Sequence, residues 1–364
     1  MKGMEIIRYI MAAFALLGAF DLLIGNKLGL GREFERGIKL MGTLVLAMVG
    51  MLILAPAIGY YLTPLVQGAE YVPIDPSSFV GIFLANDMGG APLAQALAKN
   101  EGMGLFNGLV VGSMLGGTLS FTLPYTMSVV GKEQERPLLL GLLCGIGTVP
   151  VGALVSAIML KMPLKDLLMV LLPILFVSVV LVVGLLKASR ICVKILRIFG
   201  VGIRVLIIVG LSTGVFTHLT GVGLIPHALP LADTMPTILD IAAVMSGAFP
   251  LIAVLSRLLR RPFSRLGEKM GINATSALGF LASLATNVTT FSMAKEMDDR
   301  GLLLNAAFAV SASFLLADHL AYTLSYRPEY TAAVTVGKLV AGLAAILLAY
   351  FLFCRNKKEK AKEL

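Results

Sequence analysis

An asparagine, an aspartate and two glycines interrupt a long apolar stretch of the chain. The interruption is LANDMGGAP, residues 84–92, inside the run SSFVGIFLANDMGGAPLAQALA. A carboxylate at the centre of a membrane costs about 2.5–3.5 kcal/mol on insertion scales. This cost favours a role for Asp87 in binding an ion, a ligand or a partner that needs the charge. The alternative is that Asp87 caps the N-terminus of a half-helix.

A second interruption, in the run FLLADHLAYT, contains Asp318 and His319. These side chains could bind a substrate or hold helices together, and His319 could instead relay protons. On one continuous helix Ser311 and Asp318 would be two turns apart and would share a face. The adjacent pair would point about 100° apart on such a helix, which disfavours a catalytic dyad.

Neutral polar side chains lie near these acids in the sequence. Together they suit a cation that also carries a hydroxyl, because carboxylates bind ammonium groups and amides or hydroxyls bind the hydroxyl. Asparagines in membranes equally often join helices, and for Asn107 and Asn305 both roles stay open. The predicted substrate contacts are Asp87, Asn86, Asp318, His319, Asn107, Asn305, Asn287 and Thr286.

Cationic partners for an anionic substrate are nearly absent from the middles of the apolar segments, where Lys338 is the main exception. Aromatic faces could add about 0.5–2 kcal/mol each to the binding of an ammonium group. The candidates are Phe83, Phe121, Tyr125 and Tyr322.

Helix-breaking residues accompany the first interruption, namely Gly89, Gly90 and Pro92. Glycine removes side-chain support and proline removes a backbone donor, so we expect a broken helix or hinge there. The polar run Thr286–Thr290 marks a second unusual segment. Backbone groups freed by a break cannot face lipid and must be buried in protein or line a wet cavity.

The surrounding chain reads as one all-α polytopic membrane domain. Of 364 residues, 57% are hydrophobic and 14% are charged, which is too apolar for a soluble protein of this length. About eleven apolar runs reach the length of a membrane span, about 20 residues. We place them near 6–25, 38–61, 77–98, 103–128, 137–160, 164–187, 201–224, 237–258, 274–297, 301–324 and 329–353.

A repeat organises these segments. Gly279 lies 198 residues after Gly81, and Asn305 lies 198 residues after Asn107. Chance matching among glycine-rich runs is the alternative. We expect two inverted five-segment repeats in a single domain, residues 1–353, followed by a basic cytoplasmic tail, 354–364. Repeat one covers about 5–160, a linker helix 164–187, and repeat two 201–353.

Basic residues test this arrangement through the positive-inside rule. They cluster in the predicted loops 27–39, 187–204 and 257–269 and in the tail. If segments 3 and 9 are re-entrant, entering and returning on the same side, all four clusters fall on the cytoplasmic side, the N-terminus lies outside and the two halves run in opposite directions.

Several other classes of protein find no support. The net charge of +9 is spread over loops and the tail, so no nucleic-acid partner is expected. The three cysteines and three histidines show no ligand spacing, and we predict no metal or cofactor. A Walker motif is absent from the sequence.

Four motifs together resemble the ethanolamine-utilisation permease family, EutH. They are GTLVLAMVGMLILAP, PSSFVGIFLANDMGG, GLVVGSMLGGTLSF and LLADHLAYT, in this order across nearly the whole chain. The resemblance implies a bacterial inner-membrane protein that admits ethanolamine to the cytoplasm. It also implies a functional link to a cobalamin-dependent ethanolamine ammonia-lyase inside a protein microcompartment.

The leading prediction is therefore a facilitator or secondary permease for ethanolamine, a protonated amino alcohol. A cation channel or an ion-coupled transporter for a related small amine is the alternative, and an intramembrane enzyme is the least favoured class. Lipid and ethanolamine are the expected partners, and the sequence leaves a homo-oligomer open.

Overall fold

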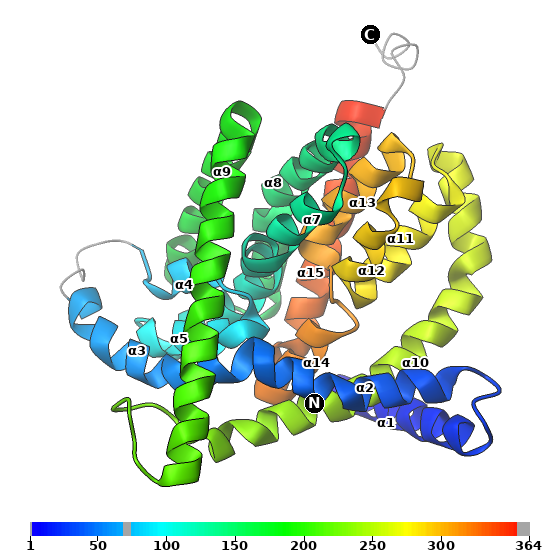
Figure 1. Ribbon diagram of the computed structural model, residues 1–364. Coiled ribbons are helices and arrows are strands. Elements are labelled where there is room, and N and C mark those ends of the chain that lie inside the picture. The colour runs from blue at the N-terminus through cyan, green and yellow to red at the C-terminus, as the bar shows by residue number, and fades with distance from the viewer. Residues whose placement is uncertain (1, 68–73, 355–364) are drawn as a thin grey trace.

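The computed structural model describes residues 2–67 and 74–354, and every regular element in these ranges is a helix (Figure 1). Seven helical stretches are long and apolar enough to cross a membrane. The basic tail predicted for 354–364 lies outside the described residues except for Cys354. The spans are Ile6–Leu23, Leu30–Leu62, Glu101–Val129, Lys132–Met159, Leu164–Thr220, Leu231–Met270 and Pro328–Cys354.

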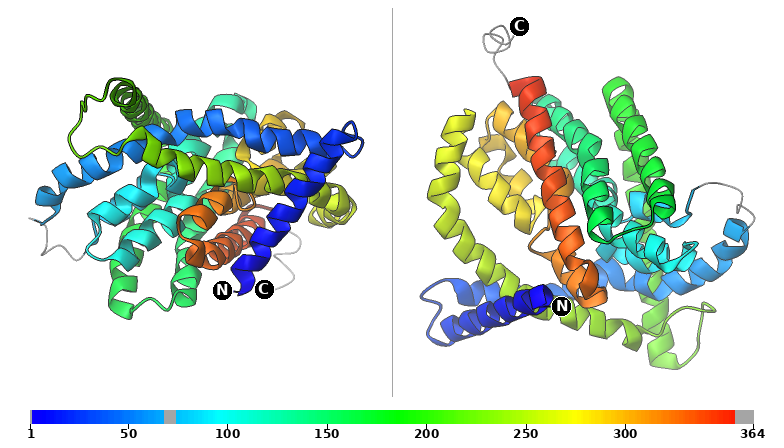
Figure 2. Two further views of the ribbon diagram at one scale, coloured as in Figure 1. Left: turned by 90° about the horizontal axis from the view of Figure 1, so that it is seen from below. Right: turned by 180° about the vertical axis from the view of Figure 1, so that it is seen from behind.

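Three helices form the centre of the bundle: α8 (Glu135–Met159), α13 (Asp299–Ala312) and α15 (Thr331–Ala349). Small residues allow their backbones to approach closely, as is typical of helix packing in membranes. A Cβ atom added to Gly152 of α8 would lie 2.4 Å from the Gly337 carbonyl oxygen of α15. The views from below and behind show α1 and α2 crossing one end of this bundle (Figure 2).

The remaining long helices surround this centre. The helix α6 continues as a wide, irregular helix through Phe106–Gly116 and Thr118–Thr122 into α7, and it is almost entirely buried. The bounds are α1 (Lys2–Leu23), α2 (Leu30–Leu44), α3 (Gly50–Gln67), α6 (Glu101–Leu105), α7 (Leu123–Val129), α9 (Leu164–Thr220) and α10 (Leu231–Met270).

Segment 3 folds back on itself. It consists of α4 (Ser77–Phe83), an extended step, the irregular turn Asn86–Gly90 and α5 (Ala91–Leu97). At its base the backbone N–H of Lys99 donates to Asp75 Oδ2 over 2.8 Å, so the segment begins and ends at the same place. The seven residues of α4 extend only about 10 Å, too short to cross a membrane.

Segment 9 is built in the same way. The helix α11 (Ala274–Ala285) ends at Thr286, whose backbone is extended (φ −163°, ψ 139°), and α12 (Asn287–Ser292) follows. At the base the backbone N–H of Asn273 donates to Asp298 Oδ1 over 2.9 Å. We call segments 3 and 9 the two hairpins from here on.

Pro92 does not break the first hairpin. It occupies the first turn of α5, where a missing backbone donor costs nothing because that donor has no partner within the helix. The break lies just before Pro92, where Gly89 has φ 80°, and a hinge role of Pro92 stays a prediction.

Segment 10 is not the continuous helix expected from its hydropathy. The helix α13 ends at Ala312, and α14 (Asp318–Tyr326) begins six residues later. Between them Phe314 has φ 57°, a strained value for a bulky side chain. Its N–H donates to the Ser283 carbonyl, and the N–H of Leu316 donates to the Leu284 carbonyl. Ser311 and Asp318 therefore do not share one helix face.

The basic stretches predicted as loops are helical. Within α9 two helices meet at a kink at Ala188 (φ −145°, ψ 46°), next to the predicted end of segment 6 at residue 187, and the rest of 187–204 is helical. Most of 27–39 belongs to α2, and 257–269 belongs to α10. Lysine and arginine favour helices and extend their charged ends to water, so charge clusters alone do not mark loops.

Gly89→Ala tests the break in the first hairpin. A Cβ at this position would lie 2.1 Å from Met51 Cγ and would also meet the positive φ. We expect a destabilisation of about 2–4 kcal/mol from strain and overpacking. The measurement is the melting temperature of purified protein in detergent. Gly147→Ala is the control, because a Cβ there meets nothing within 4 Å. Equal melting temperatures for both variants would contradict the described break.

Candidate functional site

Asp87 and His319 face each other between the first hairpin and α14. The Asp87 Oδ1 atom lies 3.8 Å from His319 Nε2, and the two side chains are 19% and 5% exposed. The turn Asn86–Gly90 positions the carboxylate, and the start of α14 positions the imidazole. The structure therefore brings together two residues that are 232 positions apart in the sequence.

Lys338 extends this pair into a line of three groups. Its Nζ atom lies 3.0 Å from His319 Nδ1 and donates to the Ser113 carbonyl oxygen. With Nζ as the donor, His319 Nδ1 is the acceptor and the ring proton sits on Nε2, which faces Asp87. Lys338 was not among the predicted contacts, although it is the one basic residue within α15. That isolation was the signal in the sequence.

Several buried polar atoms at this place have no hydrogen-bond partner within the described chain. They are the amide nitrogen and oxygen of Asn86, Asp87 Oδ1 and the hydroxyl of Tyr322. Buried polar groups in folded proteins are nearly always paired, so each such atom calls for a ligand or water. The set contains an acceptor with a negative charge, an amide and a hydroxyl, which matches an ammonium alcohol.

Asp318 is the second carboxylate of this region. It begins α14, is partly exposed, and interacts electrostatically with both Asp87 and the Arg36 guanidinium of α2. Asp318 does not share a helix face with Ser311, but it lies close enough to Asp87 for their charges to interact.

Aromatic rings lead from α7 to His319. Tyr125 stacks on Phe121 at 5.6 Å between ring centroids, Phe121 meets Phe314 at 5.9 Å, and Phe314 meets His319 at 5.0 Å. Phe83, another predicted aromatic face, packs instead against Phe199.

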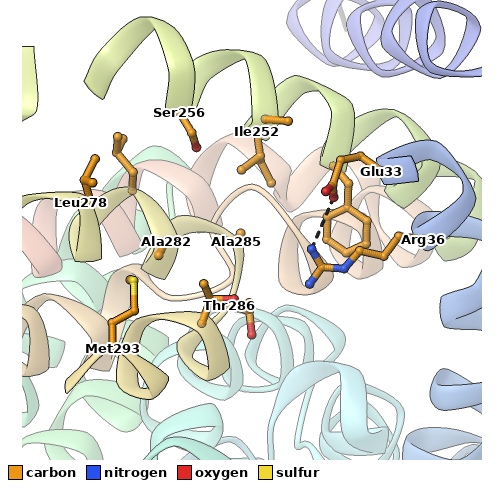
Figure 3. A pocket seen from close by; sticks show the side chains of 13 residues that line it. Glu33, Arg36, Ile252, Ser256, Leu278, Ala282, Ala285, Thr286 and Met293 are labelled. Carbon is orange, nitrogen blue, oxygen red and sulfur yellow. Dashed lines mark hydrogen bonds and ion pairs between the residues drawn. The ribbon is translucent and has the colours of Figure 1, made fainter. Parts of the chain in front are cut away.

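A cavity of about 300 Å³ lies between α2, α10, α11 and α12 (Figure 3). An ion pair of 3.4 Å joins Glu33 and Arg36 at one end, and the Arg36 guanidinium lies over the Phe249 ring. Thr286 lines the cavity at the break of the second hairpin and accepts the backbone N–H of Val288. Most of the other lining side chains are apolar: Ile252, Ala253, Leu278, Leu281, Ala282, Ala285 and Met293.

Asn287 ties the tip of the second hairpin to its neighbours. Its Nδ2 donates to Thr122 Oγ1 over 2.7 Å, and its Oδ1 accepts from Ser313 over 2.7 Å. Both polar ends of this predicted substrate contact therefore have protein partners.

Asn107 and Asn305 lie at the bases of the two hairpins. Asn107 Nδ2 donates to the Ser77 and Ser78 hydroxyls, and Asn305 Nδ2 donates to the Ser276 and Gly301 carbonyls. The bonds to Ser77, Ser78 and Ser276 join helices, and the bond to Gly301 lies within α13. A role of either amide in substrate contact stays a prediction.

Comparison with known proteins shows where the chain belongs. The sequence profile described as "Ethanolamine utilisation protein, EutH" matches residues 4–352. The chain belongs to the EutH family. No solved structure matches it.

Relatives in this family cover nearly the full length of the chain. A protein named probable ethanolamine permease EutH, from Listeria monocytogenes, is 40% identical over 99% of this chain and 97% of its own length. The protein of the same name from Salmonella typhimurium is 33% identical over 98% and 97%. The protein YxeR of Bacillus subtilis is 33% identical over 98% and 96%. The chain is thus a multi-pass membrane protein of a probable permease family.

Asn305→Ala separates the two roles of that side chain. It removes one hydrogen bond that joins α11 to α13 and one within α13, and we expect a loss of stability of about 1–3 kcal/mol. The melting temperature in detergent should fall, while the KM for ethanolamine uptake by the folded protein stays unchanged. Ser212→Ala is the control, because that hydroxyl is exposed and bonds within its own helix. A raised KM at an unchanged melting temperature would favour substrate contact.

Proposed function

We propose that the chain carries ethanolamine across the bacterial inner membrane into the cytoplasm as a facilitator or secondary permease. The observation that carries this proposal is the partly buried Asp87 carboxylate in a broken segment, whose Oδ1 atom is buried and has no hydrogen-bond partner in the described chain. Such a group is costly in a membrane and suits a small cation. The names of the relatives supply the identity of that cation.

The side chains around Asp87 suggest how the substrate binds. The ammonium group would contact Asp87, and the amide of Asn86 or the hydroxyl of Tyr322 would bind the substrate hydroxyl. Both groups are fully buried and lack partners within the described residues. Asp318 is the second candidate for the ammonium contact because its charge interacts with that of Asp87.

The cavity in Figure 3 would serve as a vestibule to this site. Its volume of about 300 Å³ exceeds what a molecule of a few non-hydrogen atoms needs. Arg36 belongs to the cavity and interacts with Asp318, so the two sites are neighbours. Thr286 places the break of the second hairpin at the cavity wall.

The two hairpins would belong to inverted repeats that move against the remaining helices. Matched positions support the repeat: Asp75 and Asn273 at the hairpin bases are 198 residues apart, and Asn100 and Asp298, which begin α6 and α13, have the same separation. In such transporters the substrate site lies between broken helices at mid-membrane. An outer N-terminus and a cytoplasmic C-terminus complete this arrangement.

The other classes of function remain distinguishable by experiment. A channel for amines would give single-channel currents, and a coupled carrier would depend on an ion gradient. Conversion of ethanolamine would belong to a soluble partner such as an ammonia-lyase and not to this chain. A homo-oligomer would not alter the site, because Asp87, His319 and Lys338 come from one chain.

Asp87→Asn is the first test. The variant keeps the size of the side chain but loses the charge that would bind the ammonium group. We expect uptake of labelled ethanolamine into proteoliposomes to fall at least tenfold, with an unchanged elution profile in detergent. Asp233→Asn is the control, because that carboxylate is exposed in the first turn of α10. Full uptake by Asp87→Asn would move the ammonium contact to Asp318.

Ala282→Phe tests the vestibule. Ala282 is partly exposed and lines the cavity, so a phenyl ring there would fill part of the volume. We expect a several-fold loss of the uptake rate without loss of folded protein. Ala232→Phe, on the exposed surface of the first turn of α10, controls for added bulk. An unchanged rate in Ala282→Phe would mean that substrate enters elsewhere.

A further inference from the structure

Lys338 is a buried amine that the proposed binding of ethanolamine does not explain. It lies in the middle of α15 with a side chain that is 1% exposed. Among the described residues, no carboxylate lies within ion-pair distance of its Nζ atom. Nζ has two acceptors, the Ser113 carbonyl and His319 Nδ1. A neutral amine has two N–H donors and an ammonium has three, so these surroundings also suit the neutral form.

The charged groups of the site are two carboxylates, Asp87 and Asp318, and one lysine, Lys338. Arg36 nearby is already paired with Glu33 over 3.4 Å. His319 and Tyr322 of α14 are the other titratable groups there. Away from their ends, the described helices that also pack on α15, namely α8, α13 and Phe106–Gly116, carry one ionisable side chain, Cys144. Asp87 is the carboxylate that Lys338 reaches through His319, so an ammonium substrate bound at Asp87 takes the negative charge that offsets Lys338.

We propose that Lys338 gives up its proton when an ammonium substrate binds at Asp87, so that each amine is exchanged for one proton. This inference rests on the proposed function and names its coupling. The N–H bond of the Lys338 ammonium breaks, the electron pair stays on Nζ, and the proton leaves to the side from which the substrate came. When the substrate departs on the other side, Nζ takes a proton from that side. The cycle moves no net charge.

His319 provides the route for this proton. Its Nδ1 faces Nζ at 3.0 Å, and its Nε2 faces Asp87 Oδ1 at 3.8 Å. Nδ1 can accept the proton of Nζ while Nε2 releases its own toward the binding site. Gly117 helps to fix the ring, since a Cβ added there would lie 3.1 Å from His319 Cε1. The Phe314 ring also packs against the imidazole of His319, with 5.0 Å between the ring centroids.

Two substitutions at Lys338 distinguish exchange from a structural role. Lys338→Arg keeps a cation that cannot lose its proton, and Lys338→Met keeps an unbranched side chain of similar length without any charge. Exchange predicts that the arginine variant binds ethanolamine at least tenfold more weakly than the methionine variant. A structural hydrogen-bond role predicts the opposite order, because arginine retains donors. Lys165→Met, an exposed lysine in the first turn of α9, is the control.

Proton release gives the direct readout. Ethanolamine is added to purified full-length protein in weak buffer with a pH dye, and binding is followed by calorimetry in parallel. We expect about one proton released per ethanolamine bound by the wild type and none by Lys338→Met. Release by Lys338→Met equal to that of the wild type would overturn the proposal, because the proton would then come from the substrate. Binding by the wild type without release would overturn it as well.

Uptake under imposed gradients separates this inference from the proposed function. In proteoliposomes, wild-type uptake should follow a pH difference and ignore a potassium diffusion potential. Uptake that follows the potential would overturn proton exchange and leave the permease intact. Neither binding nor uptake of ethanolamine by folded wild type would overturn the proposed function itself.

Discussion

Every break in a membrane helix exposes backbone groups that lipid cannot satisfy, and this constraint shapes the whole site. The chain meets it by pairing one break with another. The turn at Phe314 hydrogen bonds to the end of α11, and the break of the first hairpin turns on itself, with Gly90 donating to the Ala85 carbonyl. Asp87, Asp318 and His319 sit at or beside these breaks, so the polar site exists where the helices are interrupted.

Much of this arrangement could be predicted from the sequence because the breaks in the two hairpins are written in residue types. The paired glycines beside Asp87 and the polar run at Thr286 predict that the helix is interrupted at both places. The sequence does not indicate the break in segment 10, because SASFLLA contains neither glycine nor proline. Phe314 adopts its positive φ in a turn whose backbone hydrogen bonds go to the end of α11, a contact between distant segments. The kink at Ala188, by contrast, lies beside residue 187, where the predicted segment 6 ends.

Site residues were harder to predict than breaks. Types of side chain identified Asp87 and His319, which the fold brings together, but the same reasoning proposed Asn107 and Asn305, whose amides join helices. A buried amide has the same chemistry in both roles, so only its neighbours separate them. The sequence assigns no role to Lys338, because its importance depends on His319, a contact between distant segments.

The pairing of Phe314 and Leu316 with the end of α11 makes the two halves mechanically unequal. Backbone hydrogen bonds join the end of α11 in the second hairpin to the residues just before α14. A displacement of this hairpin would therefore also move His319, the second residue of α14. The first hairpin packs closely on the wide helix Phe106–Gly116 at Gly81, beside the Asn107 carbonyl, and Asn107 also donates to the Ser77 and Ser78 hydroxyls. The two hairpins are thus anchored differently: backbone hydrogen bonds couple the second to the residues before α14, whereas close packing and side-chain hydrogen bonds hold the first.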